Sequence, residues 1–156
     1  EGTIADIQEQ FNFAIKVRDK LSDANKAVKK IRDARDQITR VIEPMKDDPE
    51  FKDVNDMAKN ILDNVKNVEE DLYQTKNRSG QDPLNFPIRL NNKIGGLGGE
   101  VEGNDFKPTE QAKAVYDEIS GQIDTQIKTL NTIFTEQIPE FNNLIRQKEV
   151  KPVVVQ

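Results

Sequence analysis

Apolar residues recur every three or four positions through the first forty residues, and this uninterrupted period limits the fold more than any other feature. It places the apolar side chains on one face of an α-helix, whereas a half-buried strand would alternate with a period of two. One helix of about 60 Å is therefore predicted over residues 3–43. Its apolar face consists of Ile4, Ile7, Phe11, Ala14, Val17, Leu21, Ala24, Val28, Ile31, Ala34, Ile38 and Val41.

Two further segments show the same period after Pro44 and Pro49, which interrupt the first because proline cannot donate a helical hydrogen bond. One predicts a helix over 49–78 with the apolar face Phe51, Val54, Ala58, Ile61, Val65, Val68 and Leu72, widened by Met57 and Leu62. The other predicts a helix over 109–148 that starts at the N-cap Thr109 and is kinked at Pro139. Its apolar face is Ala112, Tyr116, Ile119, Ile123, Ile127, Leu130, Phe134, Ile138, Phe141 and Ile145.

Three long apolar faces have to be buried together, and an up-down-up bundle with shallow crossing angles achieves this. We therefore predict an all-α fold, an antiparallel bundle of three long helices within residues 1–150, followed by an extended C-terminal tail at 151–156. The composition agrees, because 33% of the residues are charged and only 6% are aromatic, a balance that suits elongated helices better than a sheet.

The segment between the second and third helices, residues 79–108, mixes Gly, Pro and Asn with apolar residues. A structureless loop of this length is uncommon inside a compact domain. We therefore predict a packed connector that covers one end or side of the bundle and contains a short fourth helix at about 87–101. Its apolar contacts would come from Leu84, Phe86, Ile88, Leu90 and Ile94.

Amide and guanidinium side chains gather around the beginning of this connector. They can satisfy the backbone groups of an irregular packed segment, or they can form a recognition surface on a rigid scaffold. Both interpretations remain open from the sequence. The candidate interaction surface consists of Gln74, Asn77, Arg78, Gln81, Asn85, Arg89, Asn91 and Asn92.

Cysteine and histidine are both absent, which excludes disulfides, thiolate nucleophiles, imidazole bases and Cys/His zinc sites. Carboxylate chemistry stays open, but runs such as 69–71 are typical of solvated helix faces. We expect no catalytic residue, no cofactor-binding residue and no metal ligand. The net charge of −5 argues against nucleic acid as a partner, and no apolar stretch approaches the roughly 20 residues that a membrane span needs.

The first helix carries a basic stretch in its second half. Such a helix can bind a membrane surface or an acidic partner. However, Asp33 and Asp36 stand three or four residues from cations, so ordinary ion pairs along one exposed face are expected. The cations are Lys26, Lys29, Lys30, Arg32, Arg35 and Arg40.

Residues 72–111, "LYQTKNRSGQDPLNFPIRLNNKIGGLGGEVEGNDFKPTEQ", resemble the C-terminal helical region of large bacterial secreted proteins built on sortilin-like, BNR-repeat β-propellers, often labelled glycosyl-hydrolase-like. The segments "IADIQEQFNFAIKVRDKLSDA" and "FNNLIRQKEVKPVVVQ" look like the flanks of the same region, so the resemblance covers nearly the whole chain. It implies a secreted, periplasmic or cell-surface location and a helical module that follows propeller and β-sandwich domains. Any glycosidase activity would belong to regions absent here. The chain starts at Glu1 rather than Met, as we expect of a fragment or a processed product.

Three hypotheses about function follow. The first is a non-enzymatic helical docking module, monomeric when isolated, whose partners are other domains of the parent chain or an envelope protein; an exposed apolar patch would favour it. The second is a self-associating coiled-coil adaptor, which light scattering would distinguish from a monomeric module. The third is part of a carboxylate-based glycan hydrolase, which would require an Asp or Glu with a perturbed pKa.

Overall fold

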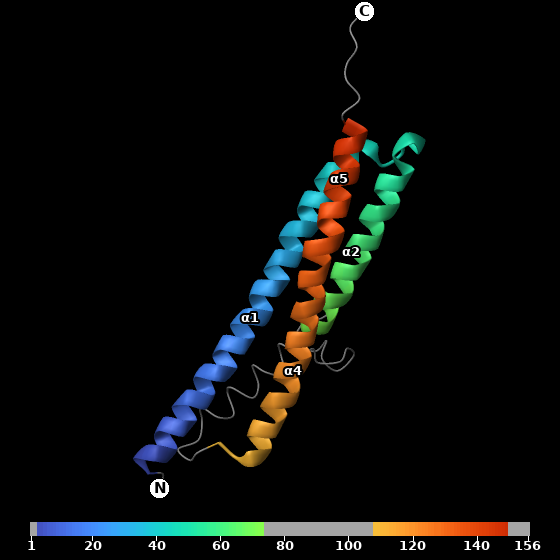
Figure 1. The fold of residues 1–156 in the computed structure, drawn as a ribbon. Helices are drawn as coiled ribbons and strands as arrows, with labels where there is room; N and C mark the ends of the chain where they lie inside the picture. Colours follow the sequence, from blue (N-terminus) through green and yellow to red (C-terminus); the bar gives the residue numbers. More distant parts are fainter. Residues whose placement is uncertain (1–2, 74–107, 150–156) are drawn as a thin grey trace, which may run out of the picture.

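The computed structural model describes residues 3–73 and 108–149, and these residues are helical apart from short turns and helix ends. Helix α1 (Ile4–Ile42) runs along the molecule, and the 3-10 turns η1 (Glu43–Met45) and η2 (Pro49–Phe51) reverse the chain into α2 (Lys52–Leu72). Helix α4 (Glu110–Thr132), the π-helical η4 (Ile133–Gln137) and α5 (Ile138–Glu149) follow one another in a single rod beside α1 (Figure 1). The predicted all-α bundle of three long helices is confirmed.

Helix ends fall where the sequence places capping residues. The Thr3 hydroxyl accepts from the Asp6 N–H at 3.0 Å while the Asp6 carboxylate accepts from the Thr3 N–H at 3.3 Å, which completes a capping box. Thr109 caps α4 as predicted, because its hydroxyl accepts from the Ala112 N–H at 3.0 Å. The predicted helix over 49–78 is present to Leu72.

Several predictions fall on parts of the chain that the structure does not describe. They are the last residues of the second predicted helix, the connector at 79–108 with its short helix at 87–101, and the extended tail at 151–156.

Pro139 changes the hydrogen bonding of the long third rod. Proline lacks an N–H, and its ring would meet the carbonyl of Thr135 in a regular α-helix. The turn before it is π-helical instead, and the Ile138 N–H bonds to the Ile133 carbonyl, five residues back. The irregularity expected as a kink at Pro139 therefore takes the form of a π-helical segment just before it. The rod then continues as α5 to Glu149.

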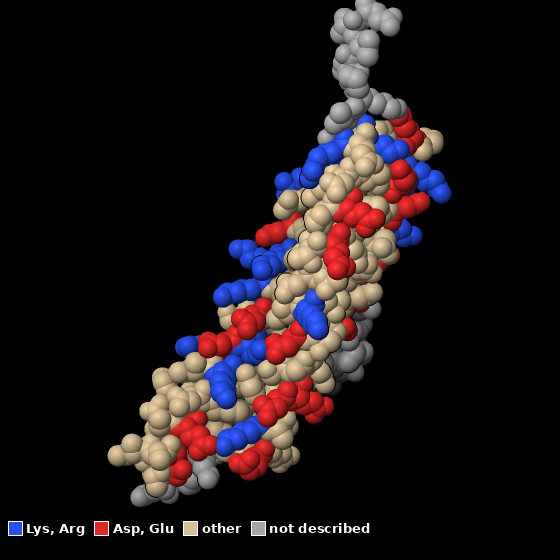
Figure 2. Space-filling view, in the orientation of Figure 1, with Lys and Arg blue, Asp and Glu red and all other residues tan. Residues whose placement is uncertain are grey.

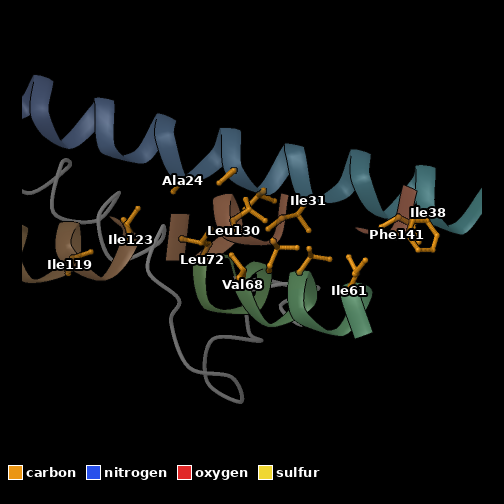
Figure 3. Close-up of a cluster of buried hydrophobic side chains, with 14 of the residues drawn as sticks. Ala24, Ile31, Ile38, Ile61, Val68, Leu72, Ile119, Ile123, Leu130 and Phe141 are labelled. Atoms are coloured by element: carbon orange, nitrogen blue, oxygen red, sulfur yellow. The ribbon is translucent and has the colours of Figure 1, made fainter. Parts of the chain in front are cut away.

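Most of the core lies where all three rods run side by side, and it continues between α1 and α4 at Ile119 and Ile123, beyond the end of α2 (Figure 3). Helix α2 has the clearest apolar face, and its buried apolar residues all belong to the face that the sequence predicted: Val54, Ala58, Ile61, Val65, Val68 and Leu72. The buried apolar residues of the other two rods are Phe13, Val17, Ala24, Ala27, Val28, Ile31, Ile38, Ile119, Ile123, Leu130, Ile133 and Phe141.

The predicted apolar face of α1 is wrong at the start of that helix and at Val41 near its end, which is 39% exposed. Ile4, Ile7 and Phe11 were expected in the core, but they are 88%, 54% and 61% exposed, and the neighbouring Phe13 is buried instead. Two physical reasons apply. Helix α2 has 21 residues and α1 has 39, so α2 ends beside the middle of α1 (Figure 1). A straight helix also rotates by about 20° per heptad relative to a repeat of three and four.

Candidate docking surface

Five apolar residues in the first turns of α1 form an apolar surface on the outside of the bundle. They are spaced three and four residues apart, so they share one side of the helix. With Gln10 and Arg18, four of them line an open groove of about 290 Å³. We call this set the α1 apolar surface, and it consists of Ile4, Ile7, Phe11, Ala14 and Ile15.

The opposite side of the same turns is fixed to α4. The Phe13 and Tyr116 rings meet edge to face, with centroids 5.6 Å apart, in a geometry that aromatic pairs prefer. One turn earlier, the Lys113 ammonium pairs with the Glu9 carboxylate. These contacts set the rotation of α1, and that rotation leaves Phe11 directed away from α4.

Two lysines form ion pairs between this part of α1 and α4. The Lys20 Nζ atom lies 2.6 Å from the Asp124 Oδ1 atom. This hydrogen bond raises the pKa of Lys20, although partial burial opposes the rise. The hydrogen bond to Glu9 likewise raises the pKa of Lys113. Both ammonium groups therefore remain charged at neutral pH, and the ion pairs between α1 and α4 persist there.

A buried carboxylate joins α1 to α2 further along. The sequence predicts a solvated helix face for the run at 69–71, but the Glu69 side chain is only 6% exposed. Arg35 Nη2 donates to Glu69 Oε2 at 2.9 Å, and Arg32 Nε lies 3.8 Å from the same oxygen. The Arg32 guanidinium also lies 5.4 Å from the centre of the Tyr73 ring. The expected pairing within α1 is therefore wrong for Arg32, which pairs with α2.

A second groove, of about 490 Å³, runs between α2 and the α4–η4 rod. Val68 and Ile133 form its apolar part, and Asn64 Nδ2 donates to Gln137 Oε1 across it at 3.0 Å. The remaining lining residues are Asn67, Gln126, Thr129 and Thr132. All of these side chains are uncharged, so the groove offers hydrogen bonds but no acid or base. Sequence reasoning missed it because its polar residues lie outside the apolar faces.

The candidate interaction surface predicted from the sequence, from Gln74 to Asn92, lies outside the described residues, so the structure does not test it. Within residues 3–73 and 108–149, no three Asp or Glu side chains come together as a metal site would require. None of the helices in those ranges is long and apolar enough to cross a membrane.

Comparison of the chain with family models, with curated proteins and with solved structures finds no match. Its function therefore has to be inferred from its own residues.

Proposed function

We propose that this chain is a non-enzymatic helical docking module and that the α1 apolar surface is its contact surface. The observation that carries the proposal is the exposure of Ile4, Ile7 and Phe11 side by side at the beginning of one helix. Single exposed apolar residues are normal on a soluble protein, whereas a contiguous group marks an interaction site. An exposed aromatic residue such as Phe11 is also the kind of side chain that dominates interface energies.

The partner that we propose is a preceding domain of a longer parent chain, as the resemblance to secreted β-propeller proteins implies. The α1 apolar surface begins at Ile4, directly after the N-cap Thr3. A domain joined before residue 1 would therefore be tethered beside this surface, and its effective concentration there would be high. A modest apolar contact is then enough for stable docking. A secreted, periplasmic or cell-surface location belongs to the same proposal.

The charged groups of the described helices support a non-enzymatic role. A glycan hydrolase needs two facing carboxyl groups, one of them with a raised pKa. Partial desolvation raises the pKa of Asp53, but hydrogen bonds from the Lys148 ammonium and the Val54 N–H outweigh it, so the net pKa is lowered. In the groove of the α1 apolar surface the ionisable residue is Arg18, whose Nε atom lies 3.8 Å from the Asp19 carboxylate.

The first experiment is to read the coding sequence upstream of residue 1, express the domain found there and titrate it with this chain. We expect binding that Phe11→Asp weakens by at least about tenfold, a loss typical of a central interface residue. The matched control is Val41→Asp, because Val41 is 39% exposed at the other end of α1. A coding sequence without a preceding domain, or binding that is unaffected by Phe11→Asp, would overturn the proposal.

A second copy of the chain could cover the same surface, which is the self-association hypothesis. Light scattering separates the two possibilities. The docking proposal expects the mass of a monomer, 17.8 kDa, at every concentration. A dimer that Phe11→Asp dissociates would favour the coiled-coil adaptor instead.

A further inference from the structure

The outer side of α1 changes from apolar to basic along its length. Residues 11 and 29 are separated by about five helical turns, so Phe11 and Lys29 lie on the same line along the helix. Residues 15 and 26 are separated by about three turns, which brings Ile15 and Lys26 into line as well. Lys30 directly follows Lys29 and lies one turn after Lys26. Figure 2 shows blue side chains along the outer edge of the molecule where the middle of α1 lies.

These three lysines differ from the cations that face other helices. Lys20, Arg32 and Arg35 all pair with carboxylates of α2 or α4. In contrast, Lys26, Lys29 and Lys30 are exposed, and no carboxylate of the described residues forms an ion pair with them. We call Lys26, Lys29 and Lys30 the α1 lysine cluster. Its positive charge stands out on a chain whose net charge is −5.

We propose that the partner of α1 is an acidic protein surface, which covers the α1 apolar surface with an apolar group and pairs its carboxylates with the α1 lysine cluster. This inference rests on the proposed docking function and adds the chemistry of the partner. The distance along α1 from Phe11 to Lys29 is about 27 Å. An interface of standard size, about 800 Å² on each partner, reaches both groups at once. Complementary charge would fix the direction of docking and speed association.

A protein surface fits this arrangement better than a lipid surface. A helix that lies on a membrane has its apolar face along its whole length, with basic residues beside that face. In α1 the apolar and basic parts follow one another along the axis. A folded partner can instead place individual carboxylates opposite individual lysines.

The test uses this 156-residue chain with two probes. One is the preceding domain described above. The other is a labelled amphipathic peptide with leucine on its apolar face and glutamate on its polar face, compared with the same peptide carrying lysine in place of glutamate. We expect the domain and the glutamate peptide to bind, and the lysine peptide to bind at least about tenfold more weakly. Affinity should also fall by about tenfold as salt rises from about 50 to about 500 mM, because salt screens exposed charges.

Charge-reversal variants test whether the α1 lysine cluster causes this dependence of binding on charge. Lys26→Glu/Lys29→Glu/Lys30→Glu should weaken binding by at least about tenfold, as expected when paired charges become repulsive. The control, Lys59→Glu/Lys66→Glu/Lys128→Glu, changes the net charge equally at exposed lysines of α2 and α4 and should change affinity by less than about twofold. Circular dichroism confirms that both variants remain folded.

The outcomes separate the two proposals. Domain binding that depends on Phe11 but not on salt or on the α1 lysine cluster would overturn this inference and leave the docking function intact. Lysine-dependent binding of the glutamate peptide without binding of the preceding domain would support the acidic partner and contradict the proposed parent-chain partner. Binding to vesicles with anionic lipid, with neither the domain nor the glutamate peptide bound, would overturn the inference in favour of a membrane surface.

Discussion

Arg35 on α1 donates a 2.9 Å hydrogen bond to Glu69 on α2, and Glu69 is the charged residue buried in the described part of the bundle. Apolar faces alone allow two helices to slide by a turn, because one isoleucine replaces another at little cost. A buried carboxylate restricts this sliding, since Glu69 has to stay within reach of the Arg32 and Arg35 guanidinium groups. The pair therefore sets the register of α2 against α1.

The two sides of this pair should respond differently to substitution. Arg35→Met leaves the buried Glu69 carboxylate with only Arg32, at 3.8 Å, and we expect a loss of about 2–3 kcal/mol. Glu69→Leu leaves guanidinium groups that can reach water, since the Arg35 side chain is 35% exposed. The substitution also adds an apolar side chain at the core. We therefore expect the free energy of unfolding to change by no more than about 1 kcal/mol. Urea unfolding measures both. An equal loss in the two variants would contradict this account.

Core packing gives a second prediction. Ile61 and Ile123 are fully buried, at 1% and 0% exposure, so Ile61→Ala or Ile123→Ala should destabilise the chain by about 2–5 kcal/mol. Ile4→Ala is the control, because Ile4 is 88% exposed, and it should change stability by less than about 0.5 kcal/mol. Chemical denaturation that shows less than about 0.5 kcal/mol for both core variants would contradict the assigned core.

Phe11 and Phe13 provide a matched pair that tests the rotation of α1. Phe13 is 6% exposed and packs on Tyr116, so Phe13→Ala should cost about 3–5 kcal/mol. Phe11 is 61% exposed, and Phe11→Ala should leave the free energy of unfolding within about 0.5 kcal/mol. The reverse order in thermal or urea unfolding would show that α1 is rotated the other way.

The Lys20–Asp124 pair predicts a dependence of stability on alkaline pH. The pKa of Lys20 is raised in the folded chain above its ordinary value of 10.5. The pair therefore contributes its full stability below pH 10.5, and this contribution is lost as the pH rises through the folded-state pKa. Unfolding midpoints measured from pH 8 to above pH 11 should fall less in Lys20→Met than in the unsubstituted chain. An identical fall would show that the pair contributes nothing.

The sequence predicted α2 best. That helix contacts both other rods along its length, so the residues at its apolar positions are the ones that become buried. The prediction failed at Ile4, Ile7 and Phe11 because a periodic pattern does not reveal how far a neighbouring helix extends. The burial of Glu69 was missed for a related reason, since the cation opposite a carboxylate depends on the register between helices. The candidate docking surface consequently appeared only in the three-dimensional arrangement.

Docking at the beginning of α1 is tested most directly by NMR mapping of the bound domain. The domain that precedes residue 1 would be added to the isotope-labelled chain, and the amide shifts followed. The account predicts shifts concentrated between residues 4 and 30 of α1, lost in Phe11→Asp. Shifts concentrated instead along the groove between α2 and α4, around Asn64 and Gln137, or the absence of any shift, would contradict it.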